Sequence, residues 1–269
     1  MHWMDLILGN EWSMPLPKGN YSELNPEMLK KTLRKLQHRI SERFPEAGLG
    51  KVCQELTELG EYGFKIYKRL RQPIWGLRIL TGLSILTLIV VVVVGILSID
   101  ISSIQINGNV SESLQGLESA INEVIFLSIA IFFLGNSEMR FKRRLALRSL
   151  HALRSLAHVV DMHQLTKDPA VILAGTSFKP TESSPARTMT PYQLTRYLEY
   201  CSEMLALTSK LAALHVQYLD DPVVLGAVND VESLTQGLSN KIWQKIMILD
   251  MAGPDDVNTP AHPASPYNL

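Results

Sequence analysis

Apolar residues follow one another almost without interruption from Ile79 to Ile99, around an unbroken run of valines at residues 90–94. About 20 such residues are what a helix needs to cross the hydrocarbon core of a bilayer. A second, weaker apolar run extends from Val124 to Leu134, and it reaches the length of a span only as Leu117–Gly135. The pattern therefore predicts two membrane-spanning helices within residues 73–139.

Basic residues flank the two apolar runs, whereas residues 100–123, between the runs, contain neither Lys nor Arg. By the positive-inside rule, both flanks are expected in the cytoplasm and a loop of about residues 100–120 outside. The alternative is a re-entrant or interfacial second segment, which would put the second basic cluster on the opposite side of the membrane. The cluster at the expected inner membrane face comprises Lys65, Lys68, Arg69, Arg71, Arg140, Lys142, Arg143 and Arg144.

Outside the apolar runs, hydrophobic residues recur at helical spacing and strand signals are nearly absent. Residues 1–72 are expected to form N-terminal cytoplasmic helices, one of which begins at Asn25-Pro26. Residues 140–250 are expected to form a cytoplasmic helical bundle. Residues 251–269 are expected to be a disordered tail. The expected fold class is all-α, a transmembrane helical hairpin with a cytoplasmic helical bundle. We expect no cleavable signal peptide, because the N-terminal residues lack a basic segment followed by an apolar one.

The composition narrows the set of partners. The chain has 269 residues with 26 basic and 26 acidic side chains, so its formal net charge is zero. We expect the basic cluster to contact anionic lipid headgroups. Nucleic acid is not expected, because the cluster lacks interleaved aromatic residues. Cys53 and Cys201 are predicted to be free, buried thiols in a reducing compartment.

The densest polar constellation lies on the long helix predicted after the second apolar run, and we call it the histidine seam. Spacings of three, four and three place its first members on one stripe of the helix. Such a seam could be structural, could bind a ligand or a metal, or could titrate near neutral pH. Against a metal site, two of its histidines are two turns apart, about 10 Å along the axis. The seam comprises His151, Arg154, His158, Asp161 and His163.

Catalytic signatures are missing from the sequence: we find no Walker loop, GxSxG, HExxH or CxxC motif. Arg144 and His151 formally fit the loose Arg-x4–6-His pattern of HEPN ribonucleases, which we interpret as a chance match. His215 is expected to be a core histidine. We therefore predict no catalytic residue, no metal site and no cofactor.

Two segments carry a resemblance. The stretch from His151 to Pro169, and the region Pro191–Asp250 with its motifs at residues 197–205 and 241–247, resemble uncharacterised bacterial two-span inner-membrane proteins. The resemblance covers about residues 151–250. It implies a bacterial inner-membrane location and brings no known activity.

We expect a membrane-anchored, non-enzymatic scaffold or signalling protein whose cytoplasmic bundle binds a protein partner or forms a homo-oligomer. One alternative is an oligomeric channel or membrane-perturbing effector. A less favoured one is a membrane-tethered hydrolase or nuclease that uses His151 and His158. The side chains considered for partner contact, or else for the core, are Tyr197, Tyr200, Met204 and Trp243.

Overall fold

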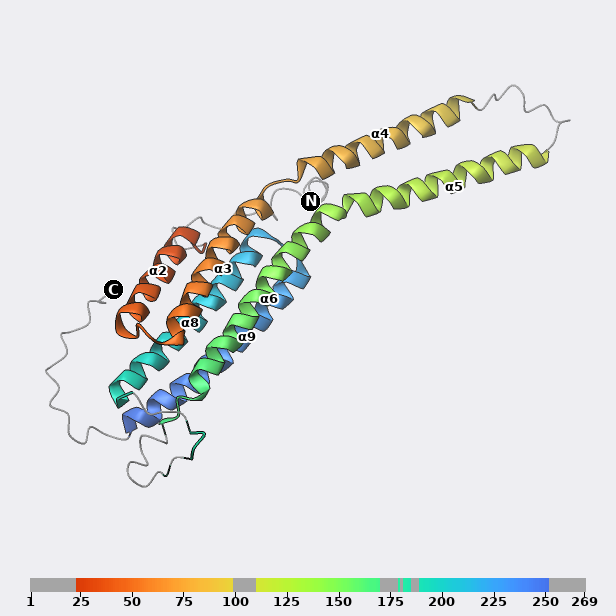
Figure 1. The fold of residues 1–269 in the computed structure, drawn as a ribbon. Helices are drawn as coiled ribbons and strands as arrows, with labels where there is room; N and C mark the ends of the chain where they lie inside the picture. Colours follow the sequence, from red (N-terminus) through yellow and green to blue (C-terminus); the bar gives the residue numbers. More distant parts are fainter. Residues whose placement is uncertain (1–22, 99–109, 170–178, 180, 185–188, 252–269) are drawn as a thin grey trace, which may run out of the picture. The chain divides into compact units, whose positions relative to one another are not determined.

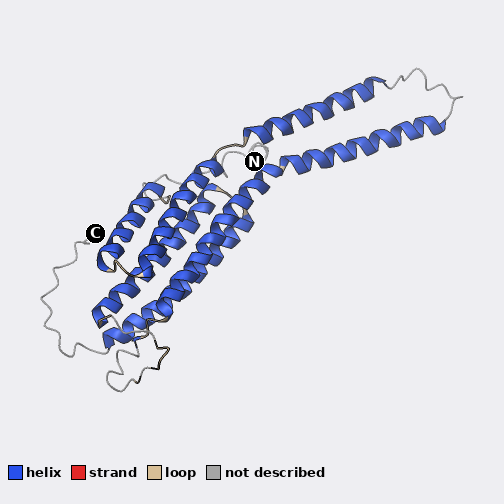
Figure 2. Ribbon diagram, in the orientation of Figure 1, coloured by secondary structure: helices blue, strands red, loops and turns tan. Residues whose placement is uncertain are grey.

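The structure, a computed structural model, describes residues 23–98, 110–169, 179, 181–184 and 189–251. Within these residues every regular element is a helix and there is no strand (Figure 2). The all-α prediction is confirmed. From residue 252 onward the expected tail lies outside the described residues.

The chain divides into two compact units. The first unit comprises residues 1–26, 59–152 and 211–229, and the second comprises residues 27–58, 153–210 and 230–269. Several helices contribute one half to each unit, so each unit is described by itself.

The first unit contains both apolar helices, α4 (Trp75–Ser98) and α5 (Val110–Gly135), which lie side by side (Figure 1). Both are long and apolar enough to cross a membrane. The 26 residues of α5 span about 39 Å at 1.5 Å per residue, more than the roughly 30 Å of a hydrocarbon core. Helix α5 is continuous over this length, and whether it spans the membrane or lies at its surface stays a prediction.

The loop between the apolar helices is shorter than expected, because α5 begins at Val110 rather than near residue 120. Val110, Leu114, Leu117 and Ile121 recur at helical spacing, so the polar residues between them extend the helix instead of ending it. Residues 99–109 lie outside the described part of the chain.

At the other end of α5 the chain passes into α6 (Ser137–Leu165) through a single turn residue, Asn136. Helical hydrogen bonding continues across this turn, since the Asn136 amide donates to Phe132 O at 3.2 Å and the Arg140 amide to Asn136 O at 3.1 Å. The first unit also includes parts of α3 (Gly48–Arg71), α8 (Pro191–Tyr218) and α9 (Pro222–Met251). The buried residues of these parts are Ile66, Leu70, Leu214, Val224 and Val228, together with Leu219 in the connection between α8 and α9.

The second unit buries one face of α2 (Pro26–Arg43). Its core includes Cys53 and Cys201, both free and fully buried, as predicted. The apolar stripe of α2 that the spacing predicts is buried, and consists of Leu29, Leu33, Leu36 and Ile40.

Three of the four residues considered for partner contact belong to the core of the second unit. Tyr197, Tyr200 and Met204 are each at most 2% exposed, and Phe44 contacts both tyrosine rings edge-on. Trp243 differs, because it is 53% exposed on α9. Of these four residues, only Trp243 is therefore accessible to a partner.

Candidate functional site

The histidine seam does not form a cluster. His151, Arg154 and His158 are exposed on α6, while Asp161 and His163 are half-buried. Among these five described residues no hydrogen bond or ion pair joins one to another. Asp161 instead accepts a hydrogen bond from Gln164 Nε2 at 2.6 Å, and the His163 ring lies against Gly48 on α3.

No group of three or more His, Cys, Asp or Glu side chains is placed to hold a metal ion within the described residues. A role for the seam in ligand binding stays a prediction. The densest network of polar contacts is found elsewhere, where the apolar helices begin and end.

The two halves of the basic cluster differ in their surroundings. The four residues at the end of α3, Lys65, Lys68, Arg69 and Arg71, are all exposed. Those at the start of α6 divide into two pairs. Arg140 and Arg144 are exposed, with the Arg140 guanidinium 4.3 Å from the centre of the Phe133 ring. Lys142 and Arg143 are engaged in ion pairs.

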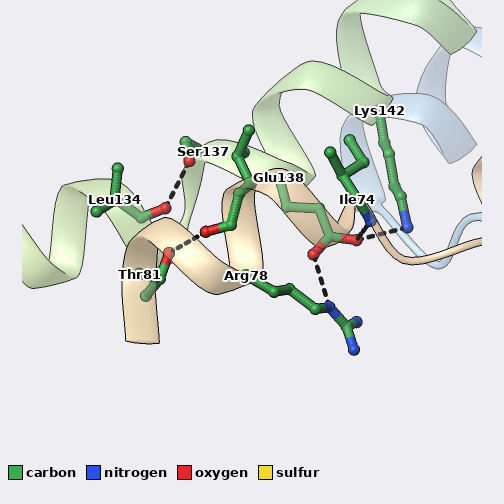
Figure 3. Close-up of polar contacts among 8 residues, drawn as sticks. Ile74, Arg78, Thr81, Leu134, Ser137, Glu138 and Lys142 are labelled. Atoms are coloured by element: carbon green, nitrogen blue, oxygen red, sulfur yellow. Dashed lines mark hydrogen bonds and ion pairs between the residues drawn. The ribbon is translucent and has the colours of Figure 1, made fainter. Parts of the chain in front are cut away.

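Glu138 lies at the centre of the first of these ion pairs (Figure 3). It belongs to the first turn of α6, and its carboxylate accepts hydrogen bonds from Lys142 Nζ at 2.9 Å and Arg78 Nε at 3.1 Å. The side chains of Glu138 and Lys142 are only 15% and 11% exposed. The pair is thus largely shielded from water, and its attraction is screened less than that of a surface pair.

Glu138 also caps a helix other than its own. The Ile74 amide, just before the first residue of α4, donates to Glu138 Oε1 at 3.3 Å (Figure 3). The first amides of a helix have no partner inside it, and a Glu of the same helix often accepts from this position. Here the acceptor comes from a residue 64 positions later. One carboxylate therefore links the start of the first apolar helix to the helix that follows the second.

Arg143 and Asp221 form the second ion pair. The guanidinium donates from Nε to Oδ1 and Oδ2 at 3.1 and 2.9 Å, and from Nη2 to Oδ2 at 2.7 Å. The Asp221 side chain is 3% exposed. Asp221 is also the N-cap of α9, since the amides of Val223 and Val224 donate to Oδ1 at 3.0 and 3.1 Å.

Burial alone would raise the pKa of the Asp221 carboxyl, but the hydrogen bonds from Arg143 and from the two cap amides outweigh it and hold the pKa below its usual range. Asp221 is therefore charged at neutral pH. Because Lys142 and Arg143 are neighbours in α6, their ion pairs connect the starts of α4, α6 and α9 within the first unit.

Near the end of α3, Tyr67 lies in a cluster of aromatic side chains and also forms a buried hydrogen bond. Tyr67 Oη donates to Leu211 O at 2.8 Å, and its ring lies edge-on to His215 at 4.9 Å between centroids. His215 Nδ1 is 3.1 Å from the carbonyl oxygens of both Leu211 and Ala212, so this nitrogen carries the proton.

His215 is fully buried, as expected for a core histidine, but its hydrogen bonding is incomplete. Nε2 has no hydrogen-bond partner in the described part of the chain. Burial lowers the pKa of His215 to about 4, because the charged imidazolium would lose its hydration. The side chain is neutral at physiological pH.

The sequence interpretation did not single out Glu138, Asp221 or Tyr67. One usable signal existed for Glu138, an acidic residue directly after an apolar run and four positions before a Lys. For Asp221 the signal was its place immediately before Pro222, which is typical of an N-cap. No local pattern marks their partners on other helices.

No family model matches the chain, and comparison with curated proteins and with solved structures also finds no match.

Proposed function

We propose that this chain is a membrane-anchored, non-enzymatic scaffold or signalling protein that uses α4 and α5 as its anchor and presents its other helices to a partner or to further copies of itself. One observation carries the proposal: the most apolar segments of both helices have no buried residue within the protein. In α4, Ile79, Leu83 and Leu86 are 57–66% exposed, and in α5, Phe126 and Phe132 are 70% or more exposed.

Exposed apolar surface of this extent needs an apolar environment. Removing one such side chain from water is favourable by about 1.5–3 kcal/mol, so two helices of them strongly favour transfer into lipid. A helix also satisfies its own backbone polar groups, as the hydrocarbon core requires. The hydroxyls of α4 obey the same requirement, because Thr81, Ser84 and Thr87 donate to carbonyls four residues earlier at 2.8–2.9 Å.

The proposed orientation has both chain termini in the cytoplasm. The exposed basic residues at the end of α3 and the start of α6 support it, since cytoplasmic flanks carry an excess of Lys and Arg. The membrane that we propose is a bacterial inner membrane, as expected from the sequence.

The two ion pairs favour a coupling role over a simple anchor. Glu138 accepts hydrogen bonds from both α4 and α6, and Arg143 holds the start of α9. A shift of α4 relative to α5 would therefore have to strain or break a shielded ion pair. A displacement of α4 and α5 would in this way be transmitted to the starts of α6 and α9.

Alkaline extraction of membranes from cells expressing the full chain tests the anchor. Leu86→Lys/Ile89→Lys puts two charges on the exposed face of α4, and each charge costs about 2.5–3.5 kcal/mol at the centre of a span. We expect this variant to become extractable. The matched control is Met162→Lys/Leu165→Lys, two positions on α6 that are also more than half exposed, and it should remain in the membrane pellet. Equal behaviour of the two variants contradicts the proposed anchor.

Native mass spectrometry of the detergent-released protein tests the scaffold. A monomer or dimer supports it. A closed ring of four or more subunits would favour the alternative function, an oligomeric pore, because two spans cannot enclose a channel alone.

A further inference from the structure

A hollow of about 360 Å³ opens beside the end of α3 in the first unit. One wall is aromatic and consists of Phe64, Tyr67 and Tyr218, while Lys68 and Arg71 form its rim. None of the described residues that line it is acidic. The hollow is separate from both ion pairs of this unit, because none of their residues contributes to it.

The aromatic wall is held rigidly. The Tyr67 ring stacks on Tyr218 with centroids 5.6 Å apart and meets Phe64 edge-on at 6.0 Å. The hydroxyl of Tyr67 is occupied by its hydrogen bond to Leu211 O at 2.8 Å. Tyr67 is itself only 3% exposed, so it supports the wall from behind, and the half-buried rings of Phe64 and Tyr218 present the apolar surface to the hollow.

Within the described part of the chain, the charge on the rim is not neutralised by an ion pair. Lys68 and Arg71 are both exposed, and neither forms an ion pair or hydrogen bond with any residue that the structure describes. In the same basic cluster, Lys142 and Arg143 are neutralised by Glu138 and Asp221. The two rim cations are three positions apart, so they share one helix face and repel each other. A bound anion would relieve this repulsion.

The position of the hollow points to the source of that anion. Arg71 is the last residue of α3 and lies four positions before Trp75, where the first apolar helix begins. If α4 enters the membrane as proposed above, the rim lies at the depth of the lipid phosphates. Arg and Lys are the side chains that bind phosphate groups, and aromatic rings favour this interfacial region.

We propose that this hollow binds the phosphate-bearing headgroup of an anionic phospholipid. Lys68 and Arg71 hold the phosphate, and the aromatic wall contacts the apolar part of the lipid next to it. The inference rests on the proposed membrane anchor. It goes further, because it assigns headgroup binding to one discrete site formed by two of the eight basic residues of the cluster. General attraction to an anionic surface would make all exposed cations equivalent.

The test uses the full chain in detergent, titrated with dioleoyl phosphatidylglycerol, with dioleoyl phosphatidylcholine or with inorganic phosphate, and read by native mass spectrometry. We expect phosphatidylglycerol to bind in preference to phosphatidylcholine at one site per chain. Lys68→Gln/Arg71→Gln should weaken the binding of phosphatidylglycerol roughly 10- to 30-fold. The matched control, Lys65→Gln/Arg69→Gln, removes the same charge from the same helix outside the hollow and should change it less than about 3-fold.

Equal losses in the two double variants overturn the inference, since they would show diffuse charge instead of a site. Displacement of the lipid by millimolar inorganic phosphate, with loss of that phosphate binding in Lys68→Gln/Arg71→Gln, overturns the lipid as the occupant and assigns the site to free phosphate. Because all four substituted side chains are exposed, both variants should fold. If the wild type resists alkaline extraction but binds phosphatidylglycerol no better than phosphatidylcholine, this inference alone is contradicted. If alkaline extraction removes the wild type from the membrane, the proposed anchor itself is contradicted.

Discussion

Arg143 and Asp221, 78 positions apart in the sequence, form an ion pair in which the carboxylate simultaneously caps α9. The aspartate is almost fully buried while the arginine remains partly exposed. The two interactions depend on one side chain, so they should be lost together when it is changed.

Replacing Asp221 by Ala should lower the free energy of unfolding by about 2–4 kcal/mol, because it removes the cap and leaves Arg143 unpaired. Asp221→Asn should cost less, since an asparagine still caps the helix. The measurement is thermal or denaturant unfolding of the detergent-solubilised protein. Asp220→Asn, at the exposed neighbouring position, is the control and should shift stability by no more than about 0.5 kcal/mol. Equal effects at the two positions would show that the ion pair contributes nothing.

Glu138→Gln should loosen the start of α4. The substitution preserves size, but it leaves the buried Lys142 ammonium without its counter-charge and weakens the acceptor for the Ile74 amide. We expect a loss of about 1–3 kcal/mol and faster amide exchange in peptides that cover residues 73–80. Hydrogen–deuterium exchange measured by mass spectrometry provides the readout.

Glu118→Gln serves as the control for Glu138→Gln. Glu118 is exposed on α5, and its replacement should leave exchange at the start of α4 unchanged. Unaltered exchange in both variants would contradict the capping role of Glu138.

The buried His215 should make the protein less stable in mild acid. Its folded-state pKa of about 4 lies below its ordinary value of 6.5, so the unfolded chain binds the proton more tightly. The contribution of His215 to stability is fully present above pH 6.5 and is lost as the pH falls toward 4, by up to about 3 kcal/mol. Tyr67, the titratable side chain in contact with it, does not titrate in this range, because a phenol is neutral in acid and burial raises its pKa further.

The midpoint of thermal unfolding, recorded between pH 7.5 and 4.5, checks this dependence. Carboxylates also lose stabilising charge in acid, so the informative quantity is the difference between the wild type and His215→Gln. The variant should show a shallower decline below pH 6.5. Parallel curves would assign the acid sensitivity to other groups.

Trp243 and Met247 are the clearest candidates for contact with a partner. They are one turn apart on α9 and are 53% and 58% exposed. Trp243→Ala/Met247→Ala should leave the unfolding midpoint nearly unchanged but reduce self-association or partner capture in chemical cross-linking. The control is Met162→Ala/Leu165→Ala, a similarly exposed pair on α6, and it should leave cross-linking intact. Equal cross-linking in all three proteins would exclude this face of α9.

Sequence reasoning identified the helices well, because the signals for them are local. The apolar run at Ile79–Ile99 and the stripe Leu29, Leu33, Leu36 and Ile40 each specify a helix and its apolar surface within a few turns of chain. The start of α5 was misplaced, because polar residues at 110–123 resemble a loop in composition although their spacing is helical. Both free thiols and the core position of His215 were also predicted correctly.

The polar contacts could not be predicted in the same way, because an ion pair needs a partner from a distant part of the chain. The sequence presents Lys142, Arg143 and Arg144 as three equivalent cations. The tertiary structure pairs the first with Glu138, the second with Asp221, and leaves the third exposed. Tyr67 likewise reads as an ordinary core residue until its ring is found between Phe64 and Tyr218.

The sequence by itself therefore determined which segments are helical, which are apolar enough for a membrane, and where charge accumulates beside them. These properties depend on hydrophobicity and periodicity over about 20 residues. Only the tertiary structure decided which charges are neutralised and which remain available to a ligand, because helix ends far apart in the sequence must first be brought within hydrogen-bonding distance. On that basis the exposed Lys68 and Arg71 differ from Lys142 and Arg143, which are held in ion pairs.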